Sequence, residues 1–448
     1  MQQCDILINA RWCVPVEPAE LVLEDHAVAI SDGRIAAVLP SREAARRFRP
    51  GVVISRPGHV LIPGLVNAHT HAAMTLLRGL ADDLPLERWL REAVWPAEKR
   101  YVSAEMVRDG TRHAIAEMLK AGITCFSDQY FFPDIVAETA VDLHMRAVVG
   151  APIIDFPTGW ARDAGEYLGK ATDLLHDPYA DHPLIGTCFA PHATCSLSDE
   201  TFRQLRVLAD QLDVPVQIHL HETSAEIAAS VRDTGKRPIE RLHDLGLVNA
   251  SLLAVHAVHL TAAEMDLMAS AGVNIAHCPR SNLKLASGIA DVAAMQRAGI
   301  NVSLGTDGAA SNNVLDLLGE MRTAALLAKT VSGDPAAVPA ADALRMATLG
   351  GARALGLGDR IGSIEVGKWA DLACLDLERL HSHPVYDPVS QLVYTASASQ
   401  VSDVWVAGRH QVEEGKLAHA SEDEIFARSA EWQLRIAGTT GKSAAPGR

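Results

Sequence analysis

The chain has 448 residues, 48% of them hydrophobic and 21% charged, with 32 Gly and 22 Pro spread along it, which is a globular rather than a low-complexity composition. This length predicts one large domain with a smaller companion. The 55 acidic and 40 basic side chains leave a formal charge of −15, so the field of the protein repels polyanions, and nucleic acid is excluded as a partner.

The start of the chain and its cysteines indicate a cytoplasmic protein. Residues 1–7 contain no basic stretch followed by an apolar run. No segment approaches the roughly 18 apolar residues that would span a bilayer. The seven cysteines include no CxxC pair, which favours reduced thiols over a disulfide framework. We therefore expect no membrane partner, and a homo-oligomer is compatible with the sequence.

The two ends of the chain share a β-rich pattern. Short apolar runs separated by turn residues begin at Asp5 and Ala27, and a similar texture returns over residues 364–420. These patterns predict a small β-sandwich domain formed by residues 1–60 and 364–420 together. Residues 421–448 are expected to form a C-terminal helix and tail.

Over residues 61–363, short apolar strands alternate with helical stretches, which is typical of repeated βα units around a parallel sheet. One helix is expected between the cap Ser103 and the stop signal Gly122, because apolar residues recur at helical spacing between them. Eight such units predict an α/β fold, a (β/α)8 TIM-type barrel, with its catalytic groups at the C-terminal ends of the strands. The candidate strands begin near Leu61, Ile123, Arg146, Leu184, Val214, Leu252, Val273 and Ile300.

A pair of histidines ends the first candidate strand. His69 and His71 are separated by one residue. Residues two apart on a strand project from the same face, so the two imidazoles can hold one ion. Packing alone also produces isolated HxH pairs, so this motif needs partners elsewhere in the barrel.

The fifth candidate strand offers two more histidines, His219 and His221, which again share a face. The spacing leaves open which of them is a ligand and which lines the pocket. Glu222 follows His219 by three residues, near enough to exchange protons without occupying a coordination position. The simpler interpretation of Glu222 is a solvated loop carboxylate.

The sixth and eighth candidate strands end in His256 and Asp307. Neither residue alone predicts a functional site; the pair Asp307-Gly308, for example, is first of all a turn signal. Polar residues at four strand ends nevertheless indicate one common site. Three nitrogen ligands and one carboxylate suit a single zinc ion, or another divalent transition metal, with a position left for a water whose pKa falls towards about 7.

This constellation resembles the amidohydrolase superfamily, and the resemblance covers nearly the whole chain. It implies four metal ligands, namely His69, His71, His219 and Asp307. It also implies that Glu222 shuttles protons and that His256 hydrogen-bonds the attacking water rather than the ion. No lysine follows the fourth strand, where residues 189–193 stand, so a binuclear site with a carbamylated lysine is disfavoured.

A finer resemblance is to the branch of this family that contains 5′-methylthioadenosine/S-adenosylhomocysteine deaminases. It implies that Glu98 binds the ribose hydroxyls and that His192 lies against the purine. Without the resemblance, a helix-surface charge and an ordinary loop histidine would be the simpler interpretations. The segments that carry the resemblance are residues 67–90, 95–99, 190–193, 279–285 and 304–313.

The third-strand region departs from this branch. Members that recognise the homocysteinyl group well can present two arginines there, but Ala151 stands at the first position and Arg162 approximates the second. Arg162 is therefore the expected contact for a substrate carboxylate. The missing arginine favours the smaller, uncharged methylthio substrate over S-adenosylhomocysteine.

The expected activity is hydrolytic deamination of adenine nucleosides to the inosine analogue and ammonia, with 5′-methylthioadenosine first, then S-adenosylhomocysteine or adenosine. Glu222, His256 and Asp307 are the expected catalytic residues, and Glu222 and Asp307 also face the substrate. Alternatives within the branch are a deaminase or chlorohydrolase acting on guanine, oxidised guanine, cytosine or a triazine. A non-catalytic scaffold of this fold would have lost ligands, whereas every ligand position is filled here.

Overall fold

The computed structural model describes residues 1–440, in which the strands form two eight-stranded sheets. In one sheet all neighbours are parallel and follow chain order. The Asp307 N–H donates to the His69 carbonyl at 3.0 Å, which brings the end of the last strand back to the first. The predicted barrel is confirmed. Its strands are β5 (Leu65–Thr70), β6 (Ile123–Gln129), β7 (Arg146–Ile153), β8 (Ile185–Pro191), β9 (Val216–Leu220), β10 (Leu252–His256), β11 (Asn274–His277) and β12 (Asn301–Leu304).

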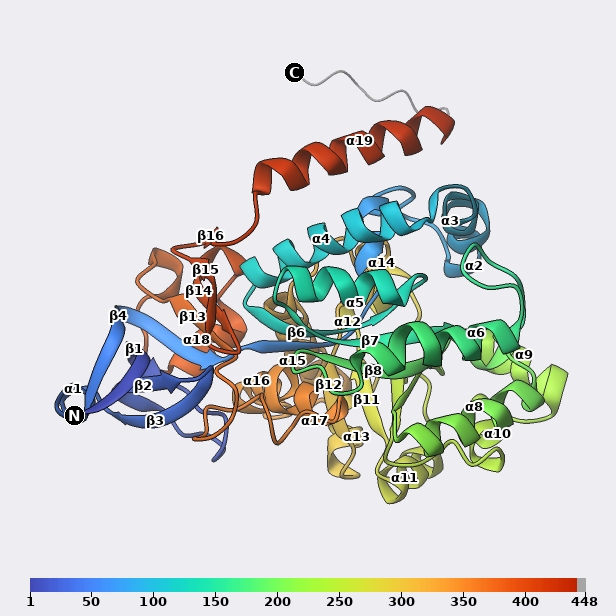
Figure 1. The fold of residues 1–448 in the computed structure, drawn as a ribbon. Helices are drawn as coiled ribbons and strands as arrows, with labels where there is room; N and C mark the ends of the chain where they lie inside the picture. The colour runs from blue at the N-terminus through green and yellow to red at the C-terminus, as the bar shows by residue number, and fades with distance from the viewer. Residues whose placement is uncertain (441–448) are drawn as a thin grey trace.

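Helices surround the barrel (Figure 1). The helix predicted from Ser103 to Gly122 is α4 (Ala104–Lys120); Ser103 Oγ accepts the Met106 N–H at 3.2 Å, and Gly122 takes a φ of +82° that suits glycine. The other principal helices are α3 (Trp95–Tyr101), α5 (Pro133–Asp142), α6 (Ala164–Lys170), α8 (Asp199–Leu212), α9 (Ser224–Thr234), α10 (Pro238–Asp244), α11 (Ala262–Ala271), α12 (Pro279–Lys284), α13 (Val292–Arg297), α14 (Ala309–Asn312), α15 (Leu317–Ser332), α16 (Ala340–Arg345) and α18 (Pro388–Tyr394).

The second sheet is built from both ends of the chain, in the order β16-β15-β14-β13-β4-β1-β2-β3. It rolls on itself, since the Ala370 N–H donates to the Gly33 carbonyl at 2.9 Å and the Gly408 N–H donates to the Ala370 carbonyl at 3.0 Å. This arrangement confirms the small β domain from both termini. Its strands are β1 (Gln2–Cys13), β2 (Leu23–Ser31), β3 (Arg34–Pro40), β4 (Phe48–Pro63), β13 (Leu372–Asp376), β14 (Val401–Val406), β15 (Arg409–Glu413) and β16 (Lys416–Leu417).

The junction between the two sheets corrects one predicted strand start. The first barrel strand begins at Leu65 rather than near Leu61, because Leu61 is part of β4 and pairs with Cys374 of the small sheet. Gly64 separates β4 from β5, and a side chain there would collide with Thr124, about 2.1 Å away. The chain therefore passes from one sheet to the other at a position that only glycine fits.

A buried ion pair joins the two sheets at the amino ends of the barrel strands. Arg146 at the start of β7 donates from Nε and Nη2 to the Asp371 carboxylate at 2.7 and 3.1 Å, and the two side chains are 2% and 1% exposed. Asp371 also accepts the Ala407 N–H at 2.7 Å, and Arg146 donates to the Pro183 carbonyl at 2.8 Å. All three guanidinium nitrogens of Arg146 and both carboxylate oxygens of Asp371 are therefore hydrogen-bonded.

The predicted C-terminal helix is α19 (Glu422–Thr440), which lies across α4 (Figure 1); residues 441–448 of the predicted tail lie outside the described residues. Arg428 and Trp432 of α19 donate to Asp109 of α4 at 2.6 and 2.8 Å. Within residues 1–440, none of the helices combines the length and the apolar character needed to cross a membrane.

Candidate metal centre

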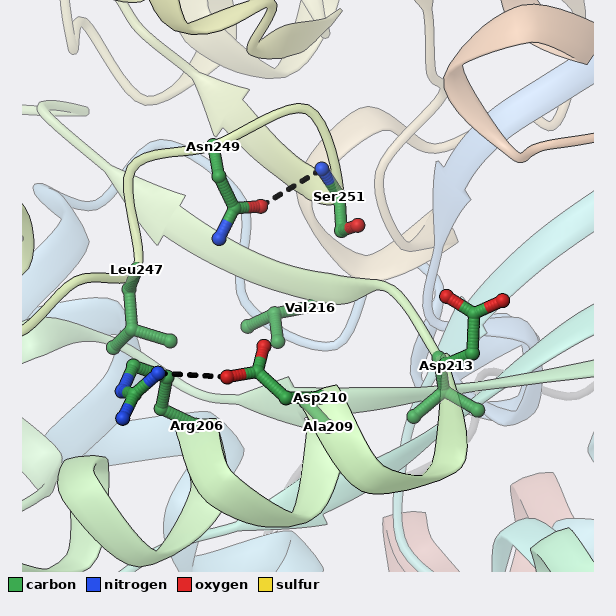
Figure 2. Close-up of a pocket in the computed structure, with 9 residues that line it drawn as sticks. Arg206, Ala209, Asp210, Asp213, Val216, Leu247, Asn249 and Ser251 are labelled. Carbon is green, nitrogen blue, oxygen red and sulfur yellow. Dashed lines mark hydrogen bonds and ion pairs between the residues drawn. The ribbon is translucent and has the colours of Figure 1, made fainter.

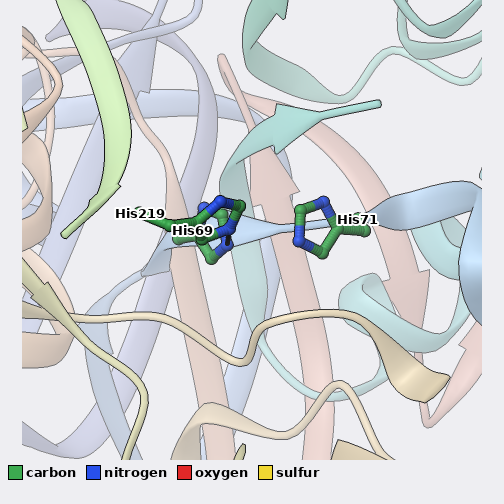
Figure 3. A group of neighbouring side chains, drawn as sticks. All are labelled: His69, His71 and His219. Atoms are coloured by element: carbon green, nitrogen blue, oxygen red, sulfur yellow. Dashed lines mark hydrogen bonds between the residues drawn. The ribbon is translucent and has the colours of Figure 1, made fainter. Parts of the chain in front are cut away.

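Three histidines meet at the carboxyl ends of the barrel strands. His69 and His71 come from the end of β5 and His219 from β9, and their ligand nitrogens lie within 4.8 Å of one another (Figure 3). His69 is fully buried, and 9% of His219 is exposed. The structure thus brings together the three imidazoles that the sequence predicts as ligands.

Backbone carbonyls orient two of these rings. His71 Nδ1 lies 2.5 Å from the Gln129 carbonyl oxygen, and His219 Nδ1 lies 2.7 Å from the His192 carbonyl oxygen. Each Nδ1–H is donated outward, so that Nε2 is the atom directed at the centre and can bind an ion in the neutral form of the ring. Burial lowers the pKa of His69 to about 4 and the pKa of His219 well below its ordinary value. Both rings are therefore neutral at pH 7, the form that binds metal.

Asp307 supplies the oxygen of the cluster. Its Oδ1 lies 3.5 Å from His69 Nε2 and 3.2 Å from His71 Nε2. Its Oδ2 accepts hydroxyl hydrogen bonds from Ser281 and Ser311 at 2.6 and 2.7 Å. Burial would raise the pKa of Asp307, but its hydrogen bonds to the two histidines hold the pKa well below the usual range.

These donors fit a borderline divalent ion. His69 Nε2 and His219 Nε2 face each other across 3.3 Å, a contact between two lone pairs unless a cation or a proton lies between them. Three imidazole nitrogens with one ionised carboxylate form a donor set that zinc prefers. Burial lowers the pKa of His71, but the hydrogen bond to Asp307 and the charge of Asp307 outweigh burial and raise that pKa to about 9, so a metal ion would displace a proton from this ring. Asp307 also has a φ of +58°, an uncommon conformation of the kind that clusters at functional sites.

The two histidines at the end of β9, His219 and His221, face different ways. His221 points away from the cluster: its Nδ1 lies 3.2 Å from the His259 carbonyl oxygen, and its Nε2 accepts the Ile239 N–H at 3.2 Å. Both ring nitrogens are therefore engaged by backbone groups, one in the loop at His259 and one in the first turn of α10. His219 is the histidine of this strand that faces the centre.

Glu222 and His256 lie beside the cluster. Glu222 Oε2 is 3.8 Å from His256 Nε2, and the His256 ring stacks on His219 with centroids 5.5 Å apart. Asn282 Oδ1 lies 2.8 Å from His256 Nδ1, and Ser287 Oγ donates to Glu222 Oε1 at 3.1 Å. Sequence reasoning missed the roles of Asn282 and Ser287, although Asn282 falls inside one of the segments that carry the resemblance.

Glu98 is linked to the cluster through a residue that the sequence did not single out. Tyr130, directly after β6, donates from its hydroxyl to Glu98 Oε1 at 2.8 Å, and its ring lies 6.4 Å from the His71 ring. Burial raises the pKa of Glu98 to about 6. The available signal was the position of Tyr130 immediately after a predicted strand, where functional groups of a barrel gather.

Of the two remaining predicted site residues, His192 lies beside the cluster and Arg162 does not. The His192 ring is exposed and lies 5.0 Å from the His219 ring, so it borders the centre. Arg162 is not brought into the cluster, because its side chain is 83% exposed and pairs with Glu166, Nε to Oε2, at 2.7 Å. It lies on the loop that follows β7, on the catalytic side of the barrel.

A small pocket lies elsewhere in the barrel, between α8 and the segments that lead into β9 and β10 (Figure 2). Arg206 and Asp210 of α8 line it and pair with each other at 2.7 Å. It opens at the amino ends of the strands, the end of this fold that does not carry catalysis. It therefore adds nothing to the site.

Comparisons with known proteins agree with this geometry. The model of the amidohydrolase family matches residues 60–410. A 5-methylthioadenosine/S-adenosylhomocysteine deaminase of Teredinibacter turnerae is 46% identical over 432 residues, covering 96% of this chain and 98% of the relative. A zinc-bound structure of an adenosine deaminase from Xanthomonas campestris is 53% identical with a TM-score of 0.97, covering 98% and 100% of the two chains. Zinc-bound atrazine chlorohydrolase of Arthrobacter aurescens is 26% identical with a TM-score of 0.89, covering 96% and 100%.

Proposed function

Because this chain belongs to the amidohydrolase family, we propose that it is a zinc-dependent hydrolase that deaminates adenine nucleosides, with 5′-methylthioadenosine as its preferred substrate. S-adenosylhomocysteine and adenosine are the further substrates, and the products are the inosine analogue and ammonia. One observation carries the proposal: Glu222, His256 and Asp307 lie around the three-histidine cluster. The names and high identities of the relatives support it.

The proposed ligands of the zinc ion are His69, His71, His219 and Asp307, whose donor atoms converge. When bound, the ion would lower the pKa of a water molecule so that it becomes a nucleophile near neutral pH. The carbonyls behind His71 and His219 keep their Nε2 atoms directed at the centre.

Two side chains transfer the protons of the reaction and a third orients the attacking water. Asp307 accepts a proton from the attacking water, with Ser281 and Ser311 holding its second oxygen. Glu222 delivers a proton to the ring nitrogen next to the attacked carbon, and His256 orients the water through Nε2. The bond from the water oxygen to carbon forms, the bond from carbon to the amino nitrogen breaks, and ammonia leaves with the transferred protons.

Substrate recognition is assigned to three residues outside the metal cluster, namely Glu98, His192 and Arg162. Glu98, held by Tyr130, accepts hydrogen bonds from the ribose hydroxyls, since a carboxylate can accept two. His192 lies against the purine. Arg162 is the proposed contact for the carboxylate of S-adenosylhomocysteine, and its exposure and its pairing with Glu166 support the preference for an uncharged methylthio group.

The test is ammonia release from a panel of adenosine, 5′-methylthioadenosine, S-adenosylhomocysteine, guanine, cytosine and an aminated triazine. We expect the highest kcat/KM for 5′-methylthioadenosine. Preference for a free base contradicts the role of Glu98. The similarity to atrazine chlorohydrolase favours one second candidate, triazine dechlorination, and chloride release from atrazine tests it in the same panel.

We further propose a cytoplasmic location. All seven cysteines are free, which is typical of proteins kept in a reducing compartment. Fractionation of the native cells, with detection of the chain in each fraction, tests this assignment.

A further inference from the structure

Glu226 lies on the first turn of α9, four residues after Glu222, and its side chain turns back from the helix. Its Oε2 accepts the Glu222 N–H at 2.8 Å, and its Oε1 accepts the His221 N–H at 3.3 Å. Both oxygens of this carboxylate are thus bonded to the backbone of the turn that carries Glu222.

The turn is sharp. His221 has a φ of +54°, a left-handed conformation that is unfavourable for a residue with a side chain. In such a turn, consecutive N–H groups converge and form a small concavity for an anion. The Glu226 carboxylate occupies that position here.

The His221 side of the turn is anchored independently. The His221 carbonyl accepts the Val258 and His259 N–H groups at 3.0 and 3.1 Å, and its ring bonds to the His259 carbonyl and to the Ile239 N–H of α10. On the Glu222 side, the backbone N–H is held by Glu226. Ser287 holds the Glu222 side chain at Oε1, while the carboxylate of α9 holds the backbone from which that side chain projects.

An ordinary helix cap does not account for these contacts. Thr223 is the N-cap of α9, and its side chain accepts the Glu226 N–H at 3.1 Å. A glutamate in the third helical position ordinarily bonds the N–H of the cap residue itself. Glu226 instead reaches Glu222 and His221, and burial, followed by the charge of Glu222, raises its pKa to about 7. Burying a carboxylate costs free energy, and capping the start of a helix does not require that burial.

We propose that Glu226 is a positioning residue for the proposed deamination: its carboxylate holds the turn that places Glu222 at the correct distance from the metal ligands. The inference rests on the proposed function, because it assigns Glu222 the proton transfer. Its role in the proposal is to hold backbone, and it is assigned no contact with the substrate or the ion.

A double-mutant cycle tests the inference. Glu226→Gln keeps the shape of the side chain and loses one of its two acceptors; it is made in the wild type and in Glu222→Gln, and kcat, KM and zinc content are measured. We expect Glu226→Gln alone to lower kcat about 10²-fold, the scale of a 1 Å misplacement, with KM within twofold and zinc retained. In the Glu222→Gln background it should lower kcat no further.

The matched control is Glu240→Gln. Glu240 is the corresponding glutamate of α10, is exposed and accepts the Arg237 N–H at 2.9 Å. It should leave kcat and KM unchanged. Multiplicative losses in the cycle, loss of zinc, or unchanged kcat in Glu226→Gln would overturn the inference. If Glu226→Gln does not fold, the same cycle with Glu226→Asp decides, because the shorter side chain cannot span both N–H groups.

Failure of the proposed function has a separate signature. It appears as wild-type protein that binds zinc and releases no ammonia from any nucleoside. In that case the position of Glu222 is compared between crystal structures of the wild type and Glu226→Gln. Glu222 displaced while His69, His71 and His219 stay in place supports it, and an unmoved Glu222 overturns it.

Discussion

The two ends of the barrel differ in how their buried charged groups are arranged. At the amino ends, Arg146 and Asp371 satisfy each other and the surrounding backbone. At the carboxyl ends, buried atoms remain without a partner in the protein, among them His69 Nδ1, Asp128 Oδ2 and Asn282 Nδ2. The imidazole lone pairs of the cluster also converge on one another. Thr124 Oγ1 near the start of β6 and Gln217 Nε2 near the start of β9 also lack a partner among the described residues, so unpaired atoms alone do not separate the two ends. The difference lies in the charged groups: the amino end has a self-contained ion pair, whereas the carboxyl end gathers imidazole and carboxylate donors that a metal ion would satisfy.

The largest expected effect comes from removing a ligand at the carboxyl end. His219→Ala should abolish measurable ammonia release, because the variant loses one of three nitrogen donors. A chelator should abolish wild-type activity too, and added zinc should restore it to the wild type and not to the variant. Metal analysis with the activity assay checks this. His243→Ala, an exposed histidine on α10, is the control and should retain full activity.

Glu222→Gln should have the next largest effect. Proton transfer by a positioned side chain contributes about 10²- to 10⁴-fold, so kcat should fall by that factor while zinc stays bound. The measurement is kcat for 5′-methylthioadenosine with metal analysis of the same sample. Full activity in this variant would falsify the proton-shuttle role.

The amino end should respond in stability rather than in chemistry. Asp371→Ala leaves Arg146 buried without its partner, and breaking a buried ion pair costs about 3–5 kcal/mol. Chemical denaturation should show that loss, while kcat per folded molecule stays near wild type. Asp210→Ala is the matched control, because it breaks the partly exposed Arg206 pair at the same end and should cost about 1 kcal/mol or less. A large fall in kcat for Asp371→Ala would erase the contrast between the ends.

The fold and the candidate site could be predicted from the sequence only in part. The barrel follows from apolar strands alternating with helices, and the polar residues that recur after those strands predict where the candidate site lies. Spacing alone does not choose between His219 and His221, because both share a strand face. The family resemblance favours His219, and in the structure the left-handed turn at His221 directs the His221 ring away from the cluster. The strand start at Leu61 was wrong because one apolar run serves both sheets and Gly64 divides it. Tyr130 was missed because a loop contact to Glu98 has no fixed spacing.

Tyr130→Phe should have a smaller effect, confined to ribose recognition. Losing one hydrogen bond to Glu98 should raise KM for nucleosides about threefold to tenfold. The Tyr130 hydroxyl also lowers the pKa of Glu98, which burial raises to about 6. In the wild type, KM should therefore rise as pH falls through about 6 and Glu98 becomes protonated. In Tyr130→Phe that rise should begin at higher pH, and KM for a 2′,3′-dideoxy analogue should not change.

Arg162→Ala should have the smallest effect and tests how far the site extends beyond the buried centre. Arg162 lies on the catalytic side, yet its side chain is 83% exposed and already pairs with Glu166. Water screens exposed charge pairs to about 1 kcal/mol or less. We therefore expect kcat/KM for S-adenosylhomocysteine to fall about two- to fivefold, with no change for 5′-methylthioadenosine, which carries no carboxylate. Equal losses for the two substrates would mean that Arg162 supports the loop after β7 through Glu166 and does not contact the substrate.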